Sequence, residues 1–190
     1  MSARPKHREA IVAAAVRLFR RQGFAATGLA QIVEASGAPK GSLYHYFPAG
    51  KAAIGAAAVQ AAGEKVAATM TALPPGDRPG DFMREYARLV AGWMRASGYR
   101  DGCPIATTVL EEAADDEGIA DAGRAVFEGW RAVLAGRLLE AGAAEDRAAE
   151  FGLTAVAAME GALVLARAER SDRPILAVGE SIGRMMDEAV

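Results

Sequence analysis

The residues able to serve as nucleophiles or bases are few in this chain, and their spacing does not suit catalysis. Its two histidines, His7 and His45, both lie in a basic amino-terminal block, and its single cysteine, Cys103, has no base near it in the sequence. Covalent catalysis needs a nucleophile with a base within hydrogen-bond reach. The sequence therefore predicts that the protein is not an enzyme, and that Cys103 is a buried packing residue and not a redox sensor.

Carboxylates cluster in EEAADDEGIAD, residues 111–121. Together with water they could hold magnesium or calcium, but their spacing matches no calcium-binding loop, and no histidine lies near them. We therefore interpret this stretch as a solvated, charged helix end. The sequence predicts no metal site and no cofactor.

A different chemistry is indicated by ASGAPKGSLYHYFPAGK, residues 35–51, where two tyrosines flank His45 between Lys40 and Lys51. Residues 1–51 carry eight basic and two acidic side chains, a net charge of +6, whereas the remainder carries 14 basic and 22 acidic ones, a net charge of −8. A basic block of this size is typical of a nucleic-acid surface, although a merely solvated surface is the alternative.

Helical periodicity divides the basic block into three helices. The first spans residues 6–22, and the second begins near Thr27 as its N-cap and closes at a left-handed turn at 36–37. In the third, roughly 39–46, a leucine and a phenylalanine four residues apart must point inward. Its outward residues are then Lys40, Ser42, Tyr44 and His45. Two short helices joined by a tight turn predict a helix-turn-helix unit, whose second helix can enter a major groove.

The segment ATGLAQIVEASGAPKGSLYHYFPAGK resembles the DNA-binding signature of TetR/AcrR-type transcriptional regulators, and its GAPKGSLYH and FPAGK variants are closest to the LmrA/YxaF-like subset. The resemblance covers residues 6–52. Two positions depart from the pattern. Pro39 stands where a serine usually caps the third helix, and Ala52 stands where an acidic residue commonly follows the lysine.

This resemblance implies which residues meet DNA. The expected contacts are Thr27, Gly28, Lys40, Gly41, Ser42, Tyr44, His45 and Lys51. Lys40, Gly41 and Ser42 would read base edges, because lysine and serine can bond them and glycine lets the helix approach closely. The others would contact the sugar-phosphate backbone. Tyr46 is assigned to packing.

Alanine dominates the chain, and β-branched and aromatic residues are sparse, which predicts an all-α fold of about nine helices. We expect residues 1–50 to form a three-helix DNA-binding domain and residues 51–190 a helical effector-binding and dimerisation domain. Large rings gather between residues 82 and 130, where a small hydrophobic effector would bind, with plain core packing as the alternative. The expected ligand-binding residues are Phe82, Tyr86, Trp93, Met94, Phe127 and Trp130.

The penultimate expected helix is apolar on every side between residues 151 and 166. A line of small residues recurs along it at spacings of four and three, as in a close helix-helix seam. Because one subunit has too few faces to cover this helix, we predict a homodimer. The expected interface residues are Gly152, Ala155, Met159, Ala162, Ile182 and Met186. At 16 residues the apolar run is short of the ~20 that span a bilayer, so no membrane partner is expected.

The sequence thus indicates a ligand-responsive transcriptional regulator, most simply a repressor that releases a palindromic DNA operator when a small hydrophobic effector binds. An activator of the same fold is one alternative. A helical small-molecule-binding protein without a DNA function is the other. The basic amino terminus lacks the apolar run of a signal peptide, and one cysteine cannot form an internal disulfide, so a cytoplasmic location is expected.

Overall fold

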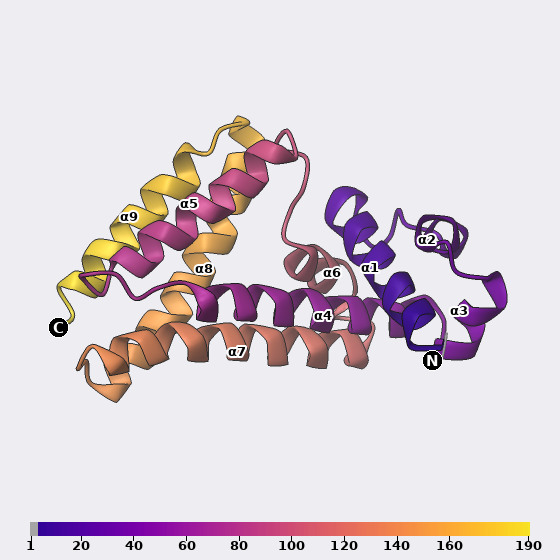
Figure 1. The fold of residues 1–190 in the computed structure, drawn as a ribbon, viewed down its shortest axis with the longest axis horizontal. Coiled ribbons are helices and arrows are strands. Elements are labelled where there is room, and N and C mark those ends of the chain that lie inside the picture. Colours follow the sequence, from indigo (N-terminus) through magenta and orange to yellow (C-terminus); the bar gives the residue numbers. More distant parts are fainter. Residues whose placement is uncertain (1–3) are drawn as a thin grey trace. The chain divides into compact units, whose positions relative to one another are not determined.

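The computed structural model describes residues 4–190, which form nine α-helices and no strand (Figure 1). The helices are α1 (Arg4–Gln22), α2 (Leu29–Ser36), α3 (Lys40–Tyr46), α4 (Lys51–Ala72), α5 (Asp81–Ala96), α6 (Pro104–Glu112), α7 (Glu117–Glu140), α8 (Glu145–Glu169) and α9 (Arg173–Asp187). The all-α prediction of about nine helices is confirmed. The first three residues of the basic amino terminus lie outside the described part of the chain.

The helices group into two compact units. The amino-terminal unit combines the chain up to Glu64 with Cys103–Val126, and the carboxy-terminal unit combines Lys65–Gly102 with Phe127–Val190. Both α4 and α7 contribute to each unit. The amino-terminal unit therefore contains α6, which packs on α1, although residues 65–102 of the carboxy-terminal unit precede it in the chain. The functional division at residue 50 stays a prediction.

The core of the amino-terminal unit is built on the apolar face of α1. Its fully buried large side chains are Ile11, Phe19, Ile32, Leu43, Ile54 and Ile119, contributed by α1, α2, α3, α4 and α7. Phe24, in the loop after α1, packs on Phe19 with ring centroids 5.1 Å apart and the rings tilted by 47°. These contacts fix α2 and α3 on one support, which is what a helix-turn-helix unit requires.

In the carboxy-terminal unit α9 packs against α5 and α8, and small residues mark the closest approaches. Gly179 of α9 meets the side chain of Ala87, and Gly152 of α8 lies so near α7 that a Cβ there would come 2.6 Å from the carbonyl oxygen of Arg131. Larger residues at these two glycines would force the helices apart.

Arg84 of α5 forms ion pairs with two carboxylates of α9. Its Nε donates to Oε2 of Glu180 at 2.9 Å, its Nη2 to Oδ2 of Asp187 at 2.8 Å, and its Nη1 to Oδ1 of Asp81 at 3.1 Å. The bond from Arg84 holds the pKa of Glu180 below its ordinary value. Burial alone would raise the pKa of Asp187, but bonds from Arg84 and from the Gly80 N–H outweigh it, and the pKa is lowered.

Replacing Arg84 by methionine is expected to destabilise the fold by about 2 kcal/mol at neutral pH, since hydrogen bonds to charged groups are lost. Because the folded pKa values of Glu180 and Asp187 lie below their ordinary values of 4.5 and 3.8, their contribution is present above those values and is lost as the pH falls through the lowered ones. The gap in Tm between wild type and R84M should therefore narrow below about pH 4. Thermal melts of both proteins over a range of pH values measure this gap.

Arg88→Met is the matched control for that series, because Arg88 forms an exposed pair with Glu85 on the same helix. An exposed pair contributes about 0–1 kcal/mol, so this variant should melt close to wild type at every pH. A Tm gap for R84M that stays constant down to pH 3 would show that Arg84 acts by packing and not by its charge.

Candidate nucleic-acid interface

The position of α3 is set by the residues at its two ends. Gly37 adopts a left-handed conformation with φ 63° and ends α2, and Pro39, with φ −56°, leads directly into α3. This combination gives the tight turn between the two helices. Leu43 and Phe47, 0% and 3% exposed, then anchor the helix to the core. One side of α3 is therefore fixed inward, and the other is turned to solvent.

The outward side of α3 carries the residues that the sequence predicts. Lys40, Gly41 and His45 are exposed and Ser42 is half-buried. Tyr44 is 52% exposed although it is a large aromatic residue. The neighbouring Tyr46 is half-buried against the core with its ring centroid 5.0 Å from that of His45, so its assignment to packing is confirmed.

Thr27 does not belong to the surface, contrary to the sequence-based assignment. Its side chain is 1% exposed, and its hydroxyl donates to the carbonyl oxygen of Gly23 at 2.7 Å. A side chain buried in this way offers no surface to a phosphate, and its role is to fold the loop between α1 and α2. The N-cap of α2 is Gly28, whose N–H donates to Oε1 of Gln31 at 2.9 Å.

Lys51 begins α4 and turns back to the loop between α1 and α2. Its Nζ donates to the carbonyl oxygen of Ala25 at 3.3 Å and lies 4.2 Å from the centroid of the Phe24 ring. A lysine ammonium carries three donors, so this bond leaves capacity for the phosphate contact that the sequence predicts.

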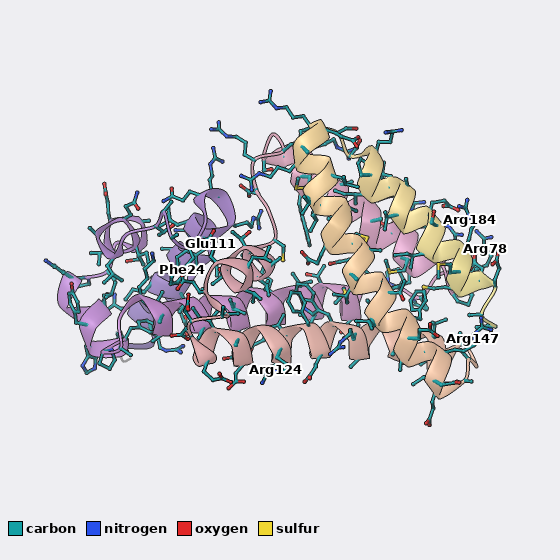
Figure 2. The ribbon with its side chains drawn as sticks, turned by 180° about the vertical axis from the view of Figure 1, so that it is seen from behind. Phe24, Arg78, Glu111, Arg124, Arg147 and Arg184 are labelled. Carbon is teal, nitrogen blue, oxygen red and sulfur yellow. The ribbon has the colours of Figure 1, made fainter. Side chains whose placement is uncertain are left out.

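Glu111, on α6, reaches the same loop and was missed by the sequence reasoning. Its Oε2 accepts the N–H of Ala25 at 2.6 Å, and Figure 2 shows Glu111 beside Phe24. The acidic stretch 111–121 was interpreted as solvated as a whole, but Asp116 also has a defined role as it accepts the N–H of Ile119 at 2.9 Å. No local signal reveals the first contact, because 86 residues separate its partners.

The predicted ligand-binding residues all belong to the carboxy-terminal unit. They are Phe82, Tyr86, Trp93, Met94, Phe127 and Trp130. The rings of Phe127 and Trp130 on α7 meet edge to face at 5.6 Å. Arg137, two turns beyond Trp130, places its guanidinium 4.8 Å from the ring centroid of Phe82 on α5. At Arg137, α7 therefore approaches the Phe82 end of α5.

The six predicted residues differ in their surroundings. Phe82, Tyr86 and Trp93 recur at spacings of four and seven and thus share one line of α5; of these three, Trp93 is exposed, at 39%. Met94, 3% exposed, falls instead on the neighbouring line with Ala87, which meets α9. Met94 therefore lies on the side of α5 that carries Ala87, apart from the line of the three rings.

The predicted dimer-interface residues are buried inside the subunit itself. Gly152, Ala155, Met159 and Ala162 are among the buried residues of α8, and Ile182 and Met186 are among those of α9. The small residues of α8 are covered by helices of the same subunit, as Gly152 is by the backbone of α7. The assignment of the small-residue seam to a surface between subunits is corrected.

The apolar surface that α8 and α9 leave exposed lies elsewhere. Its large members are Leu153, Val164, Leu165, Leu176 and Met185. Between Leu153 and Leu165 the exposed residues of α8 include no charge: they are Leu153, Thr154, Ala157, Gly161, Val164 and Leu165. On a helix these six positions fall within one side of about 120°. We call this the apolar face of α8.

By length and composition α8 would pass as a membrane span, since its most apolar window has a mean hydropathy of 1.5, and a third of that window is buried. A single such helix is weak evidence for a membrane protein. Its buried seam of small residues identifies it as a helix of the folded carboxy-terminal unit.

Comparison with known proteins agrees with this geometry. Residues 11–58 match the family described as bacterial regulatory proteins, tetR family, and residues 79–181 match the LmrA/YxaF-like C-terminal domain of transcriptional regulators. The HTH-type transcriptional regulator YxaF of Bacillus subtilis is 34% identical over 183 residues, 96% of each chain. LmrA of the same organism is 31% identical over 179 residues, 92% of this chain and 94% of its own.

Among solved structures, the regulatory protein TetR from Rhodobacter sphaeroides superposes with a TM-score of 0.82 at 25% identity, over 93% of this chain and 96% of its own. The fold and the exposed third helix define a helix-turn-helix transcriptional regulator. The chain belongs to the tetR family of bacterial regulatory proteins, in its LmrA/YxaF-like branch. The sequence resemblance, and the prediction that the protein is a regulator and not an enzyme, are thereby confirmed.

Proposed function

We propose that the protein is a ligand-responsive repressor that binds a palindromic operator as a homodimer and releases it when a small hydrophobic effector binds. The observation that carries the proposal is the outward side of α3, where Lys40, Tyr44 and His45 are exposed while Leu43 is fully buried beneath them. A basic, aromatic helix face on a rigid support suits a major groove. Such a protein acts in the cytoplasm, where the operator is.

The first turn of α3 would read base edges. The Lys40 ammonium can donate to guanine acceptors, and the Ser42 hydroxyl can bond several base edges. A Cβ added at Gly41 would have no atom within 4 Å, so the helix surface there is open for close approach. Tyr44, His45, Lys51 and Gly28, at the N-terminus of α2, would contact the sugar-phosphate backbone and fix the register.

The partner proposed for the apolar face of α8 is a second copy of this chain. A face whose exposed residues carry no charge, lined by Leu153, Gly161 and Leu165, fits the same face of another subunit across a two-fold axis, and its small residues let the helices approach closely. Leu176 and Met185 of α9, 37% and 48% exposed, would extend this contact. Two α3 helices held by one dimer would then match a palindromic site.

The proposed effector site lies between the ring-bearing sides of α5 and α7. Phe82, Tyr86, Trp93, Phe127 and Trp130 would form apolar walls suited to a hydrophobic or aromatic molecule. Met94, the sixth residue assigned from the sequence, would support α5 from its other side.

The contacts of Arg137 support a route from the proposed site to α4. Its guanidinium covers Phe82 and also donates to the carbonyl oxygens of Met70 at 3.2 Å and Leu73 at 2.8 Å, at the end of α4. A ligand that moves α5 or α7 would therefore move the end of α4. That helix runs without a break back to Lys51.

Effector and operator binding are expected to oppose each other by equal factors. A compound that weakens operator binding tenfold, about 1.4 kcal/mol, must itself bind tenfold more weakly to the DNA complex. The measurement is quenching of tryptophan fluorescence by hydrophobic compounds, with and without operator. Trp93→Phe is the control that assigns the signal to the exposed tryptophan. If compounds that quench Trp93 or Trp130 bind equally well with and without operator, the proposed site does not control operator binding.

Repression itself is tested by transcription in vitro from a promoter that contains the bound duplex. Added protein should lower the transcript level, and the effector should restore it. A rise on adding protein would identify an activator. An unchanged transcript level, together with no binding to any duplex, would favour a small-molecule-binding protein without a DNA function.

A further inference from the structure

We propose that Glu111 is a positioning residue for operator binding, which from α6 holds the loop between α1 and α2 in the conformation that DNA requires. This inference rests on the proposed function. It adds a residue outside the helix-turn-helix sequence to the machinery of DNA binding.

The backbone of Ala25 is held from both sides. Its N–H donates to Oε2 of Glu111 at 2.6 Å, and its carbonyl oxygen accepts from Nζ of Lys51 at 3.3 Å. The carboxylate also lies against Gly23, where a Cβ would come 2.6 Å from Oε1 and where φ is +88°. Only glycine suits that conformation and that proximity, so the loop backbone and the Glu111 side chain are matched in shape.

Other hydrogen bonds in the described part of this loop are local. The Thr27 N–H donates to the Phe24 carbonyl oxygen at 3.0 Å, and Nε2 of Gln22 donates to that of Ala26 at 3.0 Å. These bonds fold the loop but do not tie it to a distant helix. Glu111 and Lys51 tie it to α6 and α4 respectively, because each reaches Ala25 from a distant part of the chain.

The loop matters for DNA binding because it leads directly into α2. Gly28, three residues after Ala25, is the N-cap of that helix and is itself proposed to lie against a phosphate. Lys51, the second proposed phosphate contact, is bonded to the same loop. Holding the loop in advance removes an ordering cost from binding. Loss of the Glu111 bond should therefore weaken the complex.

Charge alone predicts the opposite result. Glu111 is an exposed carboxylate in the unit that would face the DNA phosphates, and removing a negative charge there should strengthen binding. Positioning predicts that removing the acceptor weakens binding, whether or not the charge is kept. Glu111→Gln keeps an acceptor oxygen without the charge, and Glu111→Asp keeps the charge but withdraws the acceptor by one methylene. The two accounts are thus separable.

The experiment measures Kd by fluorescence anisotropy on a duplex that the wild-type protein selects from a random-sequence pool. E111A and E111D should bind about tenfold more weakly, a loss of about 1.4 kcal/mol, and E111Q should bind as wild type or more tightly. Asp115→Ala is the charge control, because Asp115 is exposed on the turn after α6, and it should bind no more weakly than wild type. The Ala25 amide should exchange faster with solvent in E111A and E111D, and at the wild-type rate in E111Q.

Binding by E111A and E111D as tight as that of wild type would overturn the inference and leave the proposed function intact. An Ala25 amide that stays protected in folded E111D would overturn it too. If E111A fails to fold, the Kd values of E111D and E111Q test the inference, because it predicts weaker binding for E111D only. A wild-type protein that selects no duplex would overturn the proposed function and this inference with it.

Discussion

Lys40→Ala and Tyr44→Ala are each expected to weaken binding to the selected duplex about 100-fold at moderate salt, without changing the helical circular dichroism spectrum. A factor of 100 corresponds to about 2.7 kcal/mol. For Lys40 this lies within the range of about 1–3 kcal/mol for a good side-chain contact with a base. For Tyr44 it lies within the range of about 1.5–3 kcal/mol for a hydrogen bond to a charged group, here a phosphate. Both side chains are exposed, and the buried anchors of α3 remain in place, so the fold should not change.

The two variants should differ in how they change sequence preference. Lys40 is proposed to read a base, so K40A should also relax the sequence preference at one position of each half-site. Tyr44 is proposed to contact the backbone, so Y44A should weaken binding to all sequences alike. Lys65→Ala, which removes an exposed lysine of α4 in the carboxy-terminal unit, is the control for lost positive charge. Tight binding by both α3 variants would show that α3 does not enter the groove.

Leu165→Glu is expected to convert the dimer into a folded monomer that has lost operator binding. Leu165 is 51% exposed on the apolar face of α8, and a two-fold contact would bring two copies of the new carboxylate into an apolar interface. Light scattering coupled to size-exclusion chromatography measures the mass, and circular dichroism confirms the fold. DNA binding should fall because one subunit engages only one half-site.

Ala162→Glu provides the contrast, since Ala162 is 1% exposed in the seam inside the subunit. A carboxylate there has no space and no solvent, so this variant should unfold the carboxy-terminal unit and not merely separate subunits. Ala149→Glu, exposed on α8 outside the apolar face, should remain a folded dimer. An L165E protein that stays a dimer would place the interface on another surface.

The DNA-binding helix could be predicted from the sequence because its signals are local. Pro39 and Gly37 mark the turn, and the spacing of Leu43 and Phe47 determines which side of α3 is buried; both signals are confirmed. Thr27 was misplaced because a threonine before a short helix is a common N-cap. Its hydroxyl instead closes the loop on Gly23, a choice that depends on the three-dimensional path of the loop.

Long-range contacts account for what the sequence could not reveal. A helix that is apolar on all sides indicates that two faces need partners, but not which face meets its own subunit. The seam through Ala155 was therefore assigned to a second subunit although α8 buries it internally. Glu111 was hidden for a related reason, because an acidic residue in an acidic stretch gives no sign that it reaches Ala25.

The most direct test of the central proposal is selection of bound duplexes from a random-sequence pool, followed by determination of the mass of the complex. The proposal predicts enrichment of a palindrome whose half-sites are about one helical turn, roughly 34–36 Å, apart, bound by one dimer or a pair of dimers. Affinity should fall as salt rises, because phosphate contacts release counterions. Enrichment of no sequence, or binding to all duplexes with equal affinity, would contradict the proposal that α3 reads an operator.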